Sequence, residues 1–398
     1  MESATFEDPD LSFMRLDPEP SERKLVAVIV TDPRISDFSA ICHHLSMSPK
    51  IEIITVFQVF NHGFTDEIST LLHNKLLADL GSNNRQVIDA RSEQGCTLAL
   101  KVLAQAHLII TSNPYGFNDI RFNCWLHPAK IAYVPYSLWV NKRTDLTAES
   151  NITRASGVAL LESEWHVRDY ERTVPNATLK AVAAGFPRLF ELKRLNKNRV
   201  TRSTSTITIL WAPHWTSLRS PESRSYVAEL ASGLLRFCTI RSDIRVIYRP
   251  HPLFAEYLYR DTLGESVIEA IEALLASKVV SRGDDLSIPE LILSIDIAVH
   301  NCGSFTAELA ASGVPAVFSR APNDFIFESL TSFGLRAMEG HYVSESAVQT
   351  MTLIDNLLSG VDPKHSLRVE IRRELEDTVR DDPAEASARK ILDILFNT

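Results

Sequence analysis

The chain has 398 residues, which is long for a single hydrophobic core and predicts two domains with a cleft between them. Its composition is 45% hydrophobic and 23% charged, which is ordinary for a folded globular protein and excludes extensive disorder. The formal net charge is −9, so the protein lacks the basic field with which proteins hold nucleic acid, and we expect no nucleic-acid partner.

Residues 1–23 form a polar, acidic N-terminal tail without the basic and then apolar segments of a signal peptide. No window of the sequence reaches about 18 uninterrupted apolar residues, the length that spans a membrane. We therefore expect a cytoplasmic protein that can associate peripherally with a membrane-bound assembly at the inner face of the membrane.

The first domain is expected over residues 24–190, where apolar runs typical of buried parallel strands alternate with helical segments. The expected strands are 24–32, 51–60, 87–90, 107–112, 130–137 and 157–163, followed by one that ends at Gly185 and Pro187, and the expected helices are 38–47, 65–79 and 97–106. Strands that alternate with helices indicate a doubly wound, Rossmann-like sheet.

Residues 191–206 are basic and then rich in Ser and Thr, which predicts an interdomain linker. A second Rossmann-like domain is expected over residues 207–344, with strands at 207–213, 244–252, 278–282, 296–301 and 314–320 and helices at 221–238, 287–295 and 304–313. Residues 345–398 are expected to form C-terminal helices that pack back on the N-terminal domain. The fold class is therefore α/β of the GT-B type, two Rossmann-like domains facing a central cleft.

The segment DIAVHNCGSFTAEL, residues 296–309, carries the strongest candidate site. Its strand ends at Asn301, Gly303 permits a close approach of backbone, and the amides at the start of the next helix favour an anion such as phosphate. Glu308 lies one turn beyond Ser304 on the same helix face and could accept hydrogen bonds from a diol. The alternative is that Ser304 only caps the helix and that Glu308 is a solvated residue.

Polar residues follow three further strands at the same expected edge, where open α/β sheets bind ligands. In YRPHP, Arg249 and His251 suit a diphosphate. In WAPHWTS, His214, Thr216 and Ser217 are expected to face the cleft. Trp211 and Trp215 are expected in the core. Asp284 and Asp285 follow a third strand as donor ligands or as an ordinary charged loop.

No metal site and no cofactor are expected. The five cysteines are scattered and never form a CxxC pair, and the histidines form no HExxH motif.

The ordered set of motifs resembles the CDP-glycerol glycerophosphotransferase family, GT-B enzymes that build teichoic-acid-like and capsular polymers. ESEWHVRDYE and GFPRLFEL are similar to its S-E and G-x-PR-x-D-x-L, ILWAPHW to its I-L-Y-A-P-T-W, YRPHP to its R-x-HP, and DDPAEASARKILDIL to its closing helix. The sequence departs from the family in three places: YVPYSLW replaces its W-HG-T motif, residues 300–303 replace its T-D-Y-S, and His214 replaces a Thr.

The resemblance implies that Arg249, His251 and Ser304 contact a donor diphosphate and that Glu308 holds a diol. The function we expect is transfer of a phospho-polyol or glycosyl unit from a CDP- or UDP-linked donor to a hydroxyl of a glycan or lipid-linked acceptor. The full expected donor-binding set is His214, Thr216, Asp285, Asn301, Gly303, Ser304, Phe305, Thr306 and Glu308. Arg249 and His251 are the expected catalytic groups that stabilise charge, with His127 or Tyr136 of the first domain as general base.

Two rival functions stay open. A UDP-sugar 2-epimerase would share the architecture and the phosphate site. It also needs carboxylates that act as acid and base in the first domain, and Asp37, Asp79 and Asp89 lie in no recognisable motif for that role. A catalytically degenerate module that binds nucleotide or glycan would explain the altered N-terminal motif.

Overall fold

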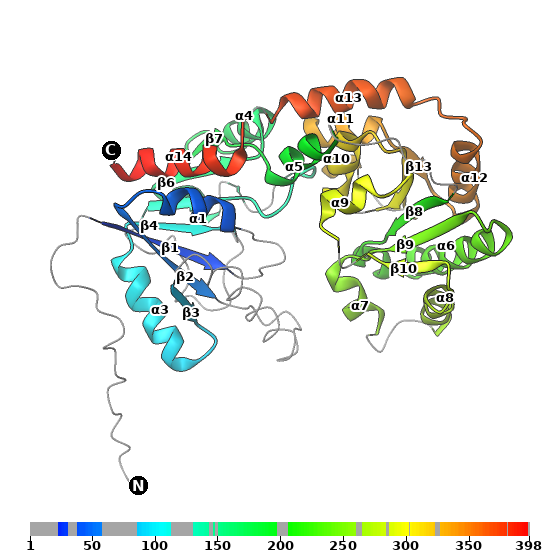
Figure 1. The fold of residues 1–398 in the computed structure, drawn as a ribbon, viewed down its shortest axis with the longest axis horizontal. Helices are drawn as coiled ribbons and strands as arrows, with labels where there is room; N and C mark the ends of the chain where they lie inside the picture. The colour runs from blue at the N-terminus through cyan, green and yellow to red at the C-terminus, as the bar shows by residue number, and fades with distance from the viewer. Residues whose placement is uncertain are drawn as a thin grey trace, which may run out of the picture.

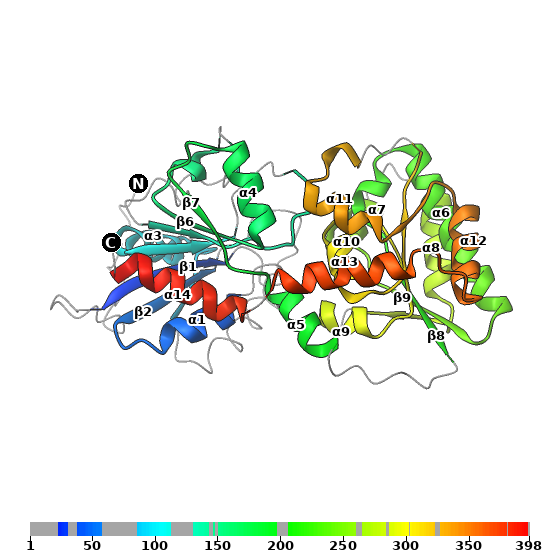
Figure 2. The same cartoon turned by 90° about the horizontal axis from the view of Figure 1, so that it is seen from above.

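The computed structural model describes residues 23–30, 38–57, 86–112, 130–142, 146–147, 150–196, 206–259, 265–283, 286–301, 303–322, 327–379 and 381–396. It shows two α/β units side by side, with the C-terminal helices α13 (His365–Asp377) and α14 (Pro383–Phe396) along one side, α13 over the second unit and α14 over the first (Figures 1 and 2). The expected fold class of two Rossmann-like units is confirmed. The expected tail up to residue 22, the expected helix 65–79 and most of the expected linker lie outside the described residues.

The first unit is a seven-stranded, fully parallel sheet in the order β3-β2-β1-β4-β5-β6-β7. Its strands are β1 (Lys24–Val30), β2 (Ile51–Phe57), β3 (Gln86–Asp89), β4 (Leu108–Thr111), β5 (Lys130–Tyr133), β6 (Gly157–Leu161) and β7 (Lys180–Ala183). The helices of this unit are α1 (Ser39–Ser46), α3 (Glu93–Gln105) and α4 (Glu164–Thr173). The central strands are buried on both faces, which explains their unbroken apolar sequences.

The second unit is a six-stranded parallel sheet in the order β10-β9-β8-β11-β12-β13. Its strands are β8 (Ile207–Ala212), β9 (Ile244–Tyr248), β10 (Val280–Arg282), β11 (Ile297–His300), β12 (Ala316–Ser319) and β13 (Tyr342–Ser344). Its helices are α6 (Pro221–Ile240), α7 (Pro252–Leu258), α8 (Glu265–Leu275), α9 (Ile288–Leu293), α10 (Gly303–Ser312), α11 (Ser332–Glu339) and α12 (Ala347–Leu358). The strand order reverses between β8 and β11, the position where such sheets bind ligands.

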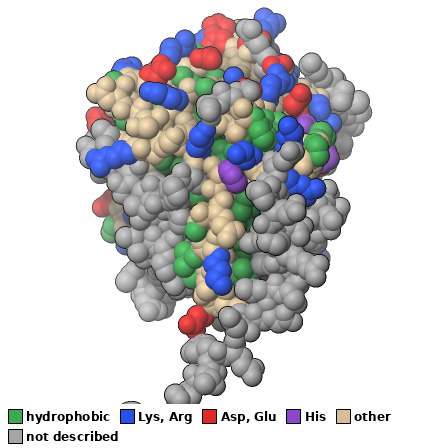
Figure 3. Space-filling view, turned by 90° about the vertical axis from the view of Figure 1, so that its left-hand side faces the viewer, with side chains coloured by type: hydrophobic (Ala, Val, Ile, Leu, Met, Phe, Trp, Pro, Cys, Tyr) green, Lys and Arg blue, Asp and Glu red, His purple; other side chains and the backbone are tan. Residues whose placement is uncertain are grey.

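Helix α5 (Pro187–Asn196) connects the units and packs on the second one, where Leu189 and Leu192 join the core beneath α9 and α10. Residues 191–196, which the composition places in a linker, are therefore the end of this helix. Helix α13 (His365–Asp377) also packs on the second unit, against α10, whereas α14 (Pro383–Phe396) packs on α1 of the first. The face in Figure 3 mixes acidic and basic side chains, so its described part has no single-sign field.

A short segment after β5, residues 138–142, passes from the first unit into the second, and we call it the strap. Its Leu138 and Val140 side chains belong to the core of the second unit. The Val140 carbonyl oxygen accepts bonds from the Thr331 amide at 2.9 Å and from the Thr331 hydroxyl at 3.0 Å. A Cβ atom on Gly334 would lie 2.0 Å from this same oxygen, so only glycine allows α11 to approach so closely.

The core of the second unit contains a buried imidazole. His341 is 1% exposed, its Nδ1–H donates to the Ala337 carbonyl oxygen at 3.1 Å, and its ring centroid lies 5.2 Å from that of buried His300. Burial, helped by the charges of Lys364 and Arg368, lowers the pKa of His341 to about 3. The ring is therefore neutral in the folded protein at any moderately acidic pH.

We expect this imidazole to make the fold sensitive to acid. The unfolded chain takes up a proton below about pH 6.5 and the folded chain only near pH 3, so stability is full above pH 6.5 and falls as the pH drops toward 3. Between pH 7 and pH 5, His341 should account for a loss of about 2 kcal/mol in the free energy of unfolding. Urea denaturation at both pH values measures this, and the His341→Gln variant should lose less than the wild type by that amount. An equal loss in both proteins would contradict the assignment.

Candidate functional site

Hydrogen bonds of main-chain and side-chain groups join the segments that follow three neighbouring strands of the second sheet. The amide of His214, after β8, donates to Asn301 Oδ1, after β11, at 2.7 Å. The Asn301 Nδ2 group donates to Ser217 Oγ at 2.6 Å, and Ser217 Oγ donates to the His214 carbonyl oxygen at 2.5 Å. His251, after β9, is anchored by its own amide, which donates to the Pro213 carbonyl oxygen at 2.9 Å. Residues from three strands therefore form one polar cluster.

Two imidazole rings meet in this cluster. The ring centroids of His214 and His251 lie 4.5 Å apart in an edge-to-face arrangement. Burial, together with the proximity of His251 and of the Arg219 cation, lowers the pKa of His214 to about 3. His214 Nδ1 accepts from the Thr216 amide at 3.4 Å and lies 2.8 Å from Thr216 Oγ1, which places the ring proton on Nε2. His214 is thus a neutral hydrogen-bond donor.

An aromatic wall adjoins the two rings. The Trp215 ring lies 4.7 Å from that of Tyr257 on α7 and 5.6 Å from that of His214. The Arg219 guanidinium stands 4.2 Å above the Trp215 ring centroid. Trp211 is buried in the core as expected, and Trp215 packs against the same core but stays half-exposed beside this cluster.

Arg249 lies at the expected strand end, but its guanidinium turns toward the neighbouring loop. Its Nη1 donates to the carbonyl oxygens of Gly283 and Leu286, the second at 2.9 Å. The side chain therefore holds both ends of the loop after β10, whereas Asp284 and Asp285 within that loop lie outside the described residues.

The first unit reaches the start of α10. A Cβ atom on Gly303 would lie 3.3 Å from Asn141 Nδ2 and 3.3 Å from Val140 Cγ2, both in the strap. The Ser304 side chain lies outside the described residues. Phe305 packs in the apolar core and Thr306 is fully buried, so these two side chains face the interior.

Glu308 forms a buried ion pair with the helix that joins the units. Its Oε1 lies 3.0 Å from Arg188 Nη1, and the side chain is 1% exposed. Burial raises the pKa of Glu308, and the Arg188 charge opposes this rise. The alternative of a solvated Glu308 is wrong. Its second oxygen, Oε2, is buried and has no hydrogen-bond partner among the described residues.

The candidate bases of the first unit are placed differently. The half-buried Tyr136 packs edge-to-face on Trp139, with 6.1 Å between ring centroids, and its carbonyl oxygen accepts from Arg188 Nη2 at 3.3 Å. His127 lies outside the described residues. Tyr136 therefore lies next to the Arg188–Glu308 pair, at the junction of the two units.

Three residues of this region were not among the expected site residues: Asn141, Arg188 and Arg219. Arg188 belongs to the GFPRLF motif, which was the available signal for it. In the part of the chain that the structure describes, no group of three or more metal-ligating side chains could hold a metal ion. None of the described helices is long and apolar enough to cross a bilayer.

Solved structures show which fold this geometry belongs to. The UDP-GlcNAc 2-epimerase from Neisseria meningitidis bound to UDP-GlcNAc matches with a TM-score of 0.56 at 12% identity, covering 94% of this chain and 100% of that one. The wall teichoic acid polymerase TagF matches with a TM-score of 0.56 at 12% identity, covering 94% and 89%. The chain has the GT-B fold. A glycosyltransferase from Rickettsia africae shares this GT-B fold, with a TM-score of 0.50 at 14% identity and coverage of 94% and 98%.

No family model and no curated protein sequence matches the chain. At these identities the structural matches establish the GT-B fold but not the reaction.

Proposed function

We propose that this protein transfers a phospho-polyol or glycosyl unit from a nucleotide-activated donor to a hydroxyl of a cell-surface glycan. The observation that carries the proposal is the contact between His214 and His251 at the ligand-binding edge of the second sheet, with Asn301 fixing the segment that leads into α10. Two imidazoles that follow different strands meet beside the segment leading to α10, and the amides at the start of that helix would bind a phosphate.

The chemistry of such a transfer suits these groups. When the bond to the donor breaks, negative charge develops on the departing nucleotide diphosphate, and preorganised donors lower the barrier. His251, the Nε2–H of His214 and the amides at the start of α10 would supply those donors. Arg219 adds positive charge beside them.

The buried Glu308 gives the donor a second anchor. Its Oε2 is buried and has no partner among the described residues, so a ribose or polyol hydroxyl could donate a hydrogen bond to it only once the packing around it opens to the donor. Arg188 keeps the other oxygen occupied and favours the charged carboxylate. The general base for the acceptor hydroxyl would come from the first unit, with Tyr136 and His127 as candidates.

The donor is a CDP- or UDP-linked unit. A CDP-polyol is supported by the ordered motifs and by the likeness to the polymerase TagF, and a UDP-sugar by the likeness to structures that contain UDP-GlcNAc or UDP. A UDP-sugar 2-epimerase is the second candidate function because such epimerases share the fold over 94% of this chain. An epimerase converts its nucleotide sugar without an acceptor, whereas a transferase needs one to form its product.

We expect nucleotide diphosphates to stabilise the protein against heat. Ligand that binds only the folded state adds about 2.7 kcal/mol at a concentration 100 times its Kd. Thermal denaturation with CDP, UDP, ADP and GDP should show the largest rise in Tm for CDP or UDP. Product analysis with CDP-glycerol, CDP-ribitol and UDP-hexoses then identifies the donor. A Tm that no nucleotide changes would contradict the proposal, and epimerised donor without any acceptor would replace it with the second candidate.

A further inference from the structure

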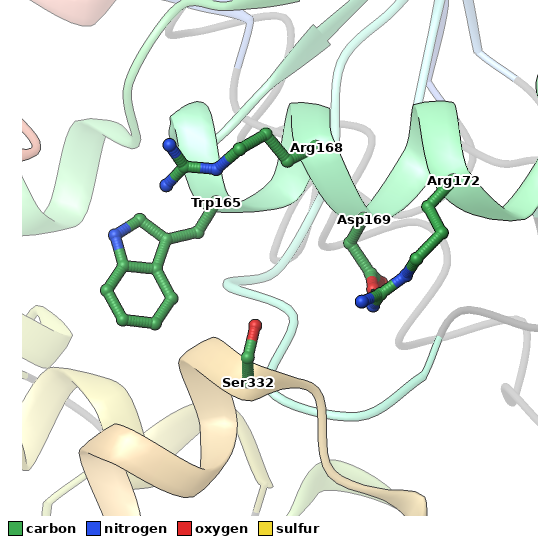
Figure 4. A pocket seen from close by; sticks show the side chains of 5 residues that line it. All are labelled: Trp165, Arg168, Asp169, Arg172 and Ser332. Carbon is green, nitrogen blue, oxygen red and sulfur yellow. The ribbon is translucent and has the colours of Figure 1, made fainter.

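A pocket of about 260 Å³ lies between the two units, away from the histidine cluster. It is lined by Trp165, Arg168, Asp169 and Arg172 of α4 and by Ser332 of α11 (Figure 4). The figure shows the indole and both guanidinium groups on the α4 side and the Ser332 hydroxyl pointing up toward them. Each unit therefore contributes one wall.

The packing beneath the pocket holds its walls in place. The Trp165 ring contacts the Phe333 ring edge-to-face at 6.2 Å between centroids, and the His166 ring contacts it at 4.6 Å. His166 is itself fixed, because its Nδ1 lies 2.7 Å from Ser163 Oγ and its Nε2 donates to the Trp139 carbonyl oxygen at 2.8 Å. A ligand would enter a site whose shape already exists, which lowers the entropy cost of binding.

The chemistry of the lining selects an anion attached to a carbohydrate or polyol. Arg168 and Arg172 are four residues apart on one helix face and are both exposed. Among the residues that line the pocket, Asp169 is the acidic one, and it pairs with Arg172; Glu164 lies one turn before Arg168 and outside the lining. Ser332 is the first residue of α11 and adds a hydroxyl at the positive end of a helix. A half-exposed indole such as Trp165 offers a flat apolar surface for a sugar or polyol.

A short chain of contacts links the pocket to the start of α10. Ser332 follows Thr331, which bonds to Val140 of the strap. The next strap residue, Asn141, lies against Gly303 at the start of α10. A ligand in the pocket would thus bind next to the segment that touches the candidate donor site.

We propose that this pocket binds a phosphate-bearing unit of the acceptor chain, at a distance from the hydroxyl that reacts. The inference rests on the proposed transferase function, and it names the acceptor as anionic. Arg168 and Arg172 bind the phosphate, Ser332 donates a hydrogen bond to it, and Trp165 contacts the polyol or sugar.

Direct binding tests the pocket without any donor. A fluorescently labelled glycerol-phosphate oligomer should bind the full-length protein, and the double variant Arg168→Ala/Arg172→Ala should bind about tenfold or more weakly because two charged hydrogen-bonding groups are lost. Arg154→Ala, which removes an exposed arginine of the same unit outside the pocket, is the matched control and should bind like the wild type. Asp169→Asn should bind more tightly, since it removes the opposing carboxylate and releases Arg172.

The proposal is overturned if the double variant binds the oligomer as the wild type does, or if Arg154→Ala weakens binding equally, which would mean nonspecific attraction. An uncharged maltose oligomer that binds as tightly as the glycerol-phosphate oligomer would overturn it as well. Nucleotide stabilisation of the same double variant should be unchanged. Oligomer binding needs no nucleotide, so the two proposals can fail separately. If no nucleotide raises the Tm of the wild type, the transferase function is contradicted. If nucleotides raise the Tm but the glycerol-phosphate oligomer does not bind, the pocket proposal is contradicted.

Discussion

Replacing His251 by Ala should lower turnover by about 100-fold or more, the effect of losing one preorganised donor to developing negative charge. The substitution leaves the main-chain bonds of His251 in place, namely its amide to Pro213 and its carbonyl oxygen to the Phe254 amide at 2.7 Å. The half-buried ring contributes little to the core, so the melting temperature should stay close to that of the wild type.

Steady-state kinetics with the donor that the nucleotide screen selects measure this effect. If the ring acts mainly on the departing diphosphate, kcat and kcat/KM fall together, whereas a ring that only binds the donor raises KM alone. The matched control is His43→Ala, because His43 is exposed on α1 of the first unit. A folded His251→Ala protein that transfers at the wild-type rate would exclude the proposed role.

The second large effect concerns the buried pair between Arg188 and Glu308. The Arg188→Met variant leaves a fully buried carboxylate without its counter-charge. Because the Arg188 side chain is itself 28% exposed, the cost in stability should lie at the low end of that for breaking a buried pair, about 3 kcal/mol. The loss should depend on pH in a definite direction. Without the cation the folded-state pKa of Glu308 rises further above its unfolded value, so stability is retained at acid pH and is lost as the pH rises through the folded pKa.

The double variant Arg188→Met/Glu308→Gln removes both charges and isolates the pair. It should recover most of the stability at pH 7 that Arg188→Met alone loses, and it should lack the fall in stability with rising pH that Glu308 causes in Arg188→Met, because Gln does not titrate. Urea denaturation of the wild type, both single variants and the double variant provides the cycle. If the double variant is as unstable as Arg188→Met, the cost comes from lost packing of the long Arg188 side chain and the electrostatic explanation is wrong.

The two-sheet fold could be predicted from the sequence because buried parallel strands leave a strong local signal. Runs such as residues 24–30 and 297–300 are apolar on both faces of the strand, and helices separate them at regular intervals. The same reasoning placed His214, His251 and Asn301 at one edge, since the carboxyl ends of neighbouring parallel strands meet there.

What packs on each face could not be predicted, because the partner residues lie far away in the sequence. Arg188 and Glu308 are 120 positions apart, so helical spacing identified the face of Glu308 but not the helix that covers it. The basic composition after residue 190 resembled a linker, although Leu192 fixes that segment to the second core. Arg249 follows a strand as expected, yet two loop carbonyl oxygens determine where its guanidinium points.

The position of α14 has a consequence for the order in which the chain can fold during synthesis. Ala384, Ala388 and Ile391 of α14 pack in one core with Val26 and Val28 of β1 and Leu45 of α1. A ribosome reaches these positions only after it has made every strand of both sheets. The unit that emerges first thus keeps part of its apolar face uncovered until the second unit has been translated, and during that interval the newly made chain presents the surface that chaperones bind.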